Sequence, residues 1–228
     1  MSMLSRFAAT GGGVATDPYW ANVSYLLVGN GANGTTTNIV DSSSNNLTTT
    51  ITGNTVISTT QSKYGSGSVY FDGSGDYLST TAITLSGDFT LECWIYQTAK
   101  SSGYVPIISG TSGSYNFPLI IDYQGSGYIG MYLPDATRAN SGVSVFDLNT
   151  WTYIACSRSG TTVRLFANGV QAASASSPVS VVLNNYGGWS PGGNSFLFNG
   201  YIYDLRITNG IARYTSNFTP PTGPLPIG

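Results

Sequence analysis

Histidine is absent from these 228 residues, glutamate occurs once, at Glu92, and charged residues make up only 8%. General acids and bases are most often His, Glu or Asp, and protein zinc sites need His or Cys. A serine nucleophile would also lack the histidine that usually activates it. The composition therefore argues against most hydrolytic and zinc-dependent chemistry. Gly, Ser, Thr, Asn and Tyr fill most polar positions instead, which suits a surface used for contact.

Basic residues are also scarce, with eight Lys and Arg against ten Asp and Glu, a formal net charge of −2. Nucleic-acid binding relies on clustered Lys and Arg, so we expect no nucleic-acid partner. No segment approaches the roughly 18 apolar residues of a transmembrane helix, and no apolar stretch near the start has the length of a signal peptide. We therefore expect no membrane insertion, and synthesis in a cytoplasm without a signal peptide.

The two cysteines, Cys93 and Cys156, lie 63 residues apart. Both fall within apolar runs, where a free cysteine behaves as a small buried residue. We favour two reduced structural thiols over a disulfide, and two cysteines alone do not form a metal site.

Short alternating runs are what the chain does contain. In residues 89–96, Phe89, Leu91, Cys93 and Ile95 fall on one face, and Glu92 falls on the other. Residues 151–156 and 162–167 read in the same way, and the Asn-Gly pairs at 168–169, 199–200 and 209–210 fit two-residue hairpin turns. Roughly a dozen such runs at a spacing of about 8–12 residues predict an all-β, antiparallel sandwich or jelly roll.

Residues 1–18 read as a separate N-terminal arm, because Thr10-Gly-Gly-Gly13 forms a flexible hinge and Asp17-Pro18 opens the next unit. We expect this extended arm to anchor an assembly, with Leu4 and Phe7 as its apolar contacts. The second unit is a domain of residues 19–228 with a proline-rich C-terminal tail, which we expect to be extended.

Three segments, in this order and spacing, resemble the laminin-G-like, concanavalin-A-like jelly rolls. They are residues 64–78 leading into 87–95, residues 151–155 with 163–169, and residues 198–207. The resemblance implies two curved antiparallel sheets packed face to face, in domains that mostly bind carbohydrate or protein, and in some relatives hydrolyse glucans.

The flanking segments resemble the version found in phage virion proteins. They are residues 23–34 with 41–43, and residues 208–214 with 218–221. That version implies a tail-fibre component or a decoration on the capsid surface, with other virion proteins as partners. We expect a homo-trimer on the virion surface, made in the host cytoplasm.

Glycoside hydrolysis requires two carboxylates about 5–10 Å apart across the sugar. The glucanase relatives place acidic residues in a Glu-x-Asp-x-x-Glu type pattern on one strand, whereas Glu92 has no second acid within five residues along its strand. We expect Glu92 to be paired with an arginine or solvated on an open sheet face. The chain is accordingly expected not to be an enzyme, unless an unrecognised pair of aspartates converges in space.

Calcium is the one metal that the sequence could still bind, because calcium takes six to eight oxygen ligands and needs neither His nor Cys. Asp72, Asp76 and Asp204 are the candidates, together with carbonyls of the glycine-rich turns. The alternative, which we favour, is that Asp72 and Asp76 cap turns. We otherwise expect no cofactor.

A glycan site would combine an aromatic ring with amide and backbone donors. The first candidate set lies in residues 186–194, with Tyr186, Trp189 and Asn194. Further candidate sets are Tyr115 with Asn116 and Phe117, and Tyr123 with Tyr128. These rings would equally suit a core edge or a subunit interface, where Tyr and Trp are enriched. Trp20, Trp94 and Trp151 are interpreted as core residues.

Two functions are thus open, and they are compatible. The first is a non-enzymatic phage virion protein anchored by residues 1–18, and the second is a module that binds host-surface polysaccharide. A third, a bacterial adhesin or lectin, would call for a secretory signal, which we do not find near the start.

Overall fold

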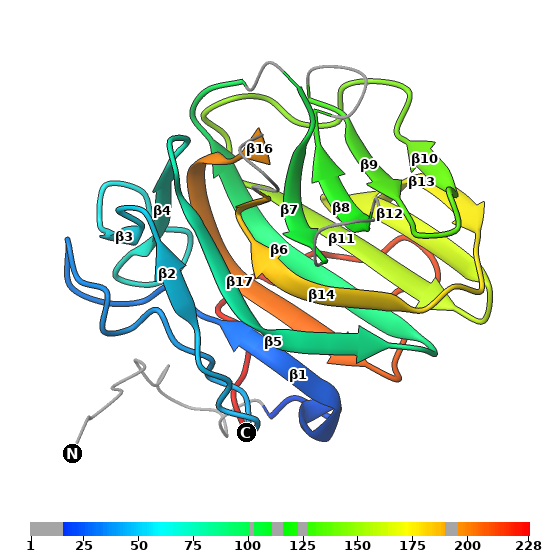
Figure 1. The fold of residues 1–228 in the computed structure, drawn as a ribbon, viewed down its shortest axis with the longest axis horizontal. Coiled ribbons are helices and arrows are strands. Elements are labelled where there is room, and N and C mark those ends of the chain that lie inside the picture. Colours follow the sequence, from blue (N-terminus) through cyan, green and yellow to red (C-terminus); the bar gives the residue numbers. More distant parts are fainter. Residues whose placement is uncertain (1–15, 101–102, 111–115, 123–126, 190–195) are drawn as a thin grey trace.

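The computed structural model describes residues 16–100, 103–110, 116–122, 127–189 and 196–228. Two antiparallel sheets pack face to face (Figure 1), and the one helix described is a single 3-10 turn, η1 (Trp20–Asn22). The predicted all-β jelly-roll sandwich is confirmed. Within the described ranges, no helix has the length and apolarity that crossing a membrane requires.

The eight-stranded sheet, sheet A, follows the order β13-β12-β11-β6-β17-β4-β3, with β1 also paired to β17. The long strand β17 (Asn199–Asn209) is central, since its first half pairs with β4, its second half with β1, and its other edge with β6. The remaining strands of sheet A are β1 (Val23–Leu27), β3 (Val56–Ser58), β4 (Ser68–Asp72), β6 (Phe89–Gln97), β11 (Thr152–Ser159), β12 (Thr162–Ala167) and β13 (Val170–Ser176).

The seven-stranded sheet, sheet B, follows the order β10-β9-β8-β7-β14-β5-β2 and faces the viewer in Figure 1. A two-stranded ribbon of β15 (Gly188–Trp189) and β16 (Phe196–Leu197) contacts β7 of this sheet. The strands of sheet B are β2 (Thr50–Thr52), β5 (Tyr77–Leu85), β7 (Val105–Ser109), β8 (Phe117–Ile121), β9 (Ile129–Tyr132), β10 (Arg138–Asn140) and β14 (Val181–Tyr186).

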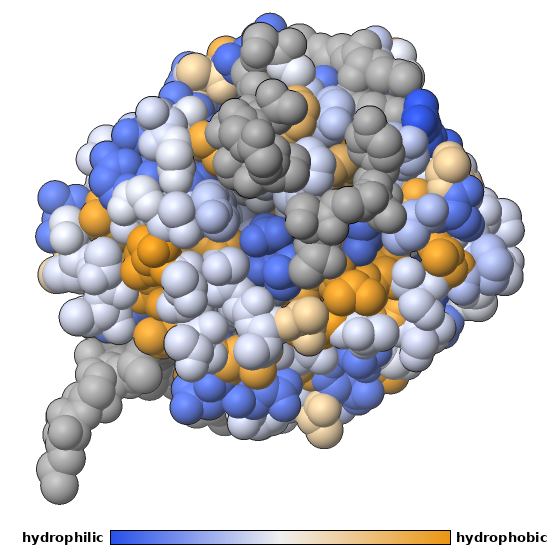
Figure 2. Space-filling model, in the orientation of Figure 1, coloured by the Kyte–Doolittle hydropathy of each residue, from blue (hydrophilic) through white to orange (hydrophobic). Residues whose placement is uncertain are grey.

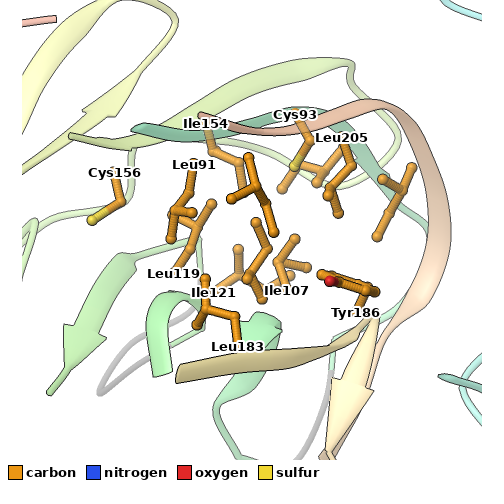
Figure 3. Close-up of a cluster of buried hydrophobic side chains, with 14 of the residues drawn as sticks. Leu91, Cys93, Ile107, Leu119, Ile121, Ile154, Cys156, Leu183, Tyr186 and Leu205 are labelled. Carbon is orange, nitrogen blue, oxygen red and sulfur yellow. The ribbon is translucent and has the colours of Figure 1, made fainter. Parts of the chain in front are cut away.

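The main core fills the space between the sheets, and Figure 3 shows side chains of both sheets meeting there. The predicted inward face of β6, including Leu91 and Cys93, is confirmed as part of it. Cys93 and Cys156 are free buried thiols, as predicted, and lie opposite Ile154 and Leu91 in the strand pairing. Burial raises the pKa of both thiols far above the ordinary value, so they remain protonated, inert core residues.

The outer face of sheet A carries a second core, because the C-terminal tail (residues 210–228) covers it. This core comprises Trp94, Tyr153, Ala155, Phe166 and Tyr203, with Tyr64, Trp151, Tyr214 and Phe218 packed against it. The tail has no helix, as predicted. Along its course Tyr214 stacks on Phe218 with ring centroids 3.5 Å apart, and the Tyr64 hydroxyl donates to the Pro221 carbonyl at 2.7 Å.

The tryptophans interpreted as core differ in burial. Trp94 is buried in this second core and Trp151 packs against its edge half-buried. Trp20 is half-buried beside a small cluster around β1.

The Asn-Gly pairs have different outcomes. Asn168 and Gly169 both have positive φ, 48° and 78°, and form the predicted hairpin turn between β12 and β13. The prediction is wrong for residues 199–200, which belong to β17, and at residues 209–210 only the glycine has a positive φ. A side chain at Gly200 would overlap the Tyr96 carbonyl oxygen, so this glycine allows a close approach of two strands.

Candidate functional site

Aromatic side chains gather on the outer face of sheet B, away from both cores. This Trp189 patch consists of Tyr104, Phe117, Ile120, Tyr132, Trp189 and Phe196. Phe117 and Ile120 are buried at its base, whereas the four other members are half-buried. Figure 2 shows the same face, where hydrophobic residues gather in patches among hydrophilic ones.

The β15–β16 ribbon places the two outermost rings. Trp189 and Phe196 are cross-strand partners, and their rings stack with centroids 5.8 Å apart. Phe196 in turn stacks on Tyr104 at 4.6 Å, and Trp189 meets Phe117 edge to face at 4.8 Å. Offset-stacked and edge-to-face contacts are the favourable arrangements of aromatic rings, so the patch is held in a defined shape.

The chain reaches this ribbon through a bend at Gly187, immediately after β14. Gly187 has φ 72°, and a side chain there would overlap the Phe71 ring. Only glycine meets both requirements, so Gly187 allows the chain to leave the sheet and carry Trp189 onto its outer face.

An arginine borders the patch on the β10 side. Arg138 lies directly opposite Tyr132 in the pairing of β10 with β9, and its guanidinium carbon is 3.8 Å from the centre of the Tyr132 ring. The guanidinium also donates a hydrogen bond to the Tyr132 hydroxyl. Sequence reasoning missed both residues, because their neighbourhood depends on a strand register that the sequence does not show.

Polar side chains support the patch from below. Asn116 is 6% exposed and donates to the Val182 carbonyl at 2.7 Å, which ties the start of β8 to β14. Ser109 donates to the Gly188 carbonyl at 3.3 Å and so fastens the base of the ribbon. Asn116, proposed from sequence as a sugar contact, therefore supports the patch from a buried position, while Phe117 forms its base.

Tyr186 requires a correction. It is 0% exposed, stacks on Tyr25 with centroids 4.7 Å apart, and shares a 2.9 Å hydrogen bond with Thr80. As the last residue of β14 it faces the main core, so it is out of reach of a glycan (Figure 3). Tyr128 is half-buried before β9, and Tyr115, Tyr123, Asn194, Leu4 and Phe7 lie outside the described residues.

The three calcium candidates have separate roles. Asp72 accepts from the backbone N–H of Ser74 at 2.7 Å, and Asp76 accepts from the backbone N–H groups of Asn54 and Asp72 at 2.7 and 2.9 Å. These are the turn-capping bonds that we favoured. Burial raises the pKa of Asp76, and the neighbouring Asp72 charge raises it further.

Asp204 lies elsewhere, at an irregularity in β17, and accepts from the backbone N–H of Leu225 at 2.6 Å. Among the described residues, no three His, Cys, Asp or Glu side chains are grouped so that they could hold a metal ion. Asp72 and Asp76 do converge, but Asp76 is completely buried and both of its oxygens hold backbone donors. Asp76 therefore has no carboxylate oxygen open to a substrate, whereas Asp72 is half-buried at the same turn.

Glu92 is paired with an arginine, as expected, but under the tail rather than on an open face. It is fully buried on the outer side of sheet A, 2.7 Å from Arg206, and both the Tyr153 and Tyr214 hydroxyls donate to it. Burial alone would raise the pKa of Glu92, but the charges of Arg206 and Arg213 and the two hydroxyl bonds hold it below its usual range. A carboxylate held ionised and enclosed in this way has no access to a substrate.

The class of protein is now defined: a two-sheet antiparallel jelly roll with an aromatic patch on the outer face of its seven-stranded sheet. The family Laminin_G_3, described as the concanavalin A-like lectin/glucanases superfamily, matches residues 72–213. The match covers more than half of the chain, which therefore belongs to this superfamily. No curated protein matches the sequence.

Solved structures share the fold at low sequence identity. Domain 4 of AbnA, a GH43 extracellular arabinanase from Geobacillus stearothermophilus, solved with arabinotriose, is 14% identical, with 84% of this chain and 94% of that chain covered and a TM-score of 0.62. Trypanosoma rangeli sialidase is 14% identical over 83% of this chain and 30% of that chain, with a TM-score of 0.58.

The enzymatically active domain of tailspike protein 2 from bacteriophage CBA120 is 13% identical over 71% of this chain and 28% of that chain, with a TM-score of 0.52. The chain thus spans nearly all of the arabinanase domain but less than a third of the sialidase and the tailspike. At these identities the likeness concerns the fold.

Proposed function

We propose that this chain is a non-enzymatic virion surface protein of a phage, a homo-trimer that contacts host-surface polysaccharide through the Trp189 patch. The observation that carries the sugar contact is the patch itself: half-buried rings held in fixed stacks on an outer sheet face of a lectin-type fold. Aromatic rings of this kind have an apolar face that can stack on the C–H side of a sugar.

The virion setting is supported by two observations. The segments of residues 23–34 with 41–43, and of residues 208–214 with 218–221, resemble those of phage virion proteins, and a phage tailspike domain shares the fold. In this proposal the protein is made in the host cytoplasm and joins a capsid or a tail through residues 1–18. The arabinanase domain solved with arabinotriose supports the sugar contact in the same way.

The proposal that the chain is not an enzyme rests on its carboxylates. Glycosidases need one carboxylic acid and one carboxylate facing each other across the sugar. Glu92 is enclosed by two arginines and two tyrosines beneath the tail, and Asp76 is buried in a turn. Neither group lies on the face that carries the Trp189 patch.

The test is binding of the intact protein to a glycan array, followed by calorimetry with the sugars that bind. We expect Trp189→Ala to weaken binding at least tenfold, since about 1.4 kcal/mol of lost stacking corresponds to that factor. Tyr19→Ala is the matched control, because this exposed ring lies beside Arg213, away from the patch, and its loss should leave the Kd unchanged. A wild-type protein that binds no sugar on the array would refute the polysaccharide contact.

A further inference from the structure

We propose that the outer face of sheet A carries a second glycan-binding site, a row of aromatic rings that binds a strand of hydroxyl-rich polysaccharide. This Tyr96 row consists of Tyr70, Tyr201, Tyr96 and Trp151, in the order in which they cross the sheet. The row lies on sheet A and the Trp189 patch lies on sheet B, so the site goes beyond the proposed function and does not depend on it.

Strand register places the row. Tyr70 on β4 lies opposite Tyr201 on β17, and Tyr201 lies opposite Tyr96 on β6. Directly opposite residues project from the same face of a sheet. The neighbouring Ile95 and Ile202 belong to the main core between the sheets, and successive side chains of a strand point to opposite faces. The three tyrosines therefore point to the outer face.

The rings form a continuous row. Ring centroids lie 4.9 Å apart for Tyr70 and Tyr201, and 5.8 Å apart for Tyr201 and Tyr96. Trp151, which directly precedes β11, adds a fourth ring 5.5 Å from Tyr96. Tyr201 is only 7% exposed, and the other three rings are half-buried. Neighbouring strands are about 4.8 Å apart, so the row extends roughly 15 Å across the sheet and can contact consecutive sugars.

The row lies beside the second core that the tail covers. Tyr214 and Phe218 of the tail pack on that core. The three tyrosines of the row belong to neither the main core nor the second core. Among the described residues, none hydrogen-bonds to their hydroxyl groups. The row therefore offers a ligand both ring surface and hydroxyl groups.

A row of polar side chains runs parallel to the rings, two residues away along each strand. It comprises Asn54, Asp72, Asn199 and Thr98. The Asn54 amide donates to the Asp72 carboxylate at 3.1 Å. The Asn199 amide donates to the Asp72 carbonyl at 2.8 Å, and the Thr98 hydroxyl donates to the Asn199 side chain. These bonds fix amide, hydroxyl and carboxylate groups beside the rings, where sugar hydroxyls can exchange hydrogen bonds with them.

The carboxylate of Asp72 favours a sugar over a proline-rich peptide. Asp72 is half-buried at the edge of the row, and an ionised carboxylate only accepts hydrogen bonds. Proline-rich segments also dock on aromatic side chains, but proline has no N–H to donate. Each hydroxyl of a sugar is a donor as well as an acceptor, so a polysaccharide can satisfy both the rings and the polar row.

The width of the row argues against a protein partner. The rings give a contact one residue wide, whereas a stable protein–protein interface buries roughly 800 Å² on each partner. A polysaccharide strand is itself narrow, so a row of rings can meet it along its length.

The experiment uses the intact protein carrying Trp189→Ala, which removes the outermost ring of the Trp189 patch. Linear neutral oligosaccharides of increasing length, prepared from glucans, mannans, galactans and arabinans, are screened on an array and then measured by calorimetry. We expect at least one series to bind, with an affinity that rises with length as more rings are contacted. Adding Tyr96→Ala should weaken this binding about tenfold or more, because a central ring is lost.

Further variants locate the contact and check the fold. Tyr70→Ala removes a ring at the end of the row, so it should weaken the longest oligosaccharides more than the shortest. Tyr96→Phe keeps the ring and should retain most of the affinity, even where thermal unfolding shows that Tyr96→Ala lowers stability. Tyr19→Ala is the control, because this exposed ring lies beside Arg213, away from the row, and its loss should leave the Kd unchanged.

Several outcomes would overturn the second site. Sugar binding by the wild type that disappears completely in Trp189→Ala would remove it and leave the Trp189 patch standing. Equal affinities with and without Tyr96→Ala, or a wild-type protein that binds no neutral oligosaccharide, would remove it as well. Subunits that dissociate in sedimentation when Tyr96→Ala is introduced, with sugar binding unchanged, would instead assign the row to a subunit interface.

Discussion

Asp17, Glu92, Arg206 and Arg213 form a buried network of two acids and two bases. None of the four side chains is more than 9% exposed, and Asp17 lies 2.8 Å from Arg206 and 2.7 Å from Arg213. Breaking one pair in such a network is costly, because the partner is left as an uncompensated buried charge. A chain with few charges thus places four of them where each depends on the others.

We expect Glu92→Gln to lower the free energy of unfolding at pH 7 by about 3 kcal/mol. The lowered pKa of Glu92 means that its contribution is present above the unfolded value of about 4.3 and is lost as the pH falls through the folded value. Urea unfolding between pH 7 and 3 should therefore show a smaller acid-induced loss in the variant than in the wild type.

Asp147→Asn is the control, since this aspartate is exposed. A Glu92→Gln protein that keeps wild-type stability at pH 7 would contradict the assigned role.

Single residues also show where sequence reasoning stopped. The alternation in residues 89–96 correctly predicted which side chains face the core. For Glu92, an arginine partner was one of two expectations. The alternation could not identify Arg206, because that pairing joins strands 114 residues apart. Tyr186 was misread because the glycines that follow it suggested an exposed loop, although Tyr186 itself ends a buried strand.

Among secondary-structure elements, the β12–β13 hairpin is held both by its own turn and by a hydrogen bond from the tail. Its Asn168-Gly169 turn has the backbone angles that the sequence predicts, and the Phe218 N–H of the tail donates to the Gly169 carbonyl at 2.9 Å. The same dipeptide at residues 199–200 forms the first two residues of β17, where Asn199 pairs with Asp72. In this chain, Asn-Gly therefore forms a hairpin turn where its backbone is not already paired with a neighbouring strand.

Gly169→Ala should destabilise the protein more than Gly160→Ala, which lies in the preceding β11–β12 turn. Both glycines have positive φ, 78° and 58°, so each substitution costs about 1 kcal/mol for the backbone conformation. At Gly160 the new methyl group meets nothing within 4 Å, whereas at Gly169 it would overlap the Phe218 carbonyl oxygen. We expect a further loss of about 1–3 kcal/mol at Gly169, measured by urea unfolding.

Equal losses for the two variants would mean that the tail does not hold this hairpin.

For the whole molecule, the fold class, the core face of β6 and the extended tail were predictable, because they depend on local alternation and on proline. The second core beneath the tail was not, because nothing local indicates that residues 210–228 return across sheet A. The Trp189 patch was predictable only in part. Its tryptophan lay in a glycine-rich segment, but Tyr104, Tyr132 and Phe196 join it through sheet pairing and packing.

The anchoring role proposed for residues 1–18 predicts that removing residues 1–15 abolishes incorporation into phage particles while the free protein still folds. Thr16 and Asp17 are kept because Asp17 is buried and pairs with two arginines. Purified particles are assayed for the protein, and thermal unfolding compares the free forms. Normal incorporation of the truncated protein would remove the anchoring proposal, while Arg164→Gln should incorporate as wild type does.

The central position of β17 has a consequence for synthesis of the protein. This strand follows all the other strands of sheet A in the sequence, yet β1, β4 and β6 all pair with it, so the middle of sheet A is incomplete until residues 199–209 have been made. Contacts between residues so distant along the chain make folding slow. The aromatic rings of β6 and β11 remain uncovered on the growing chain until the tail follows β17, and it is during this interval that the protein is most exposed to aggregation.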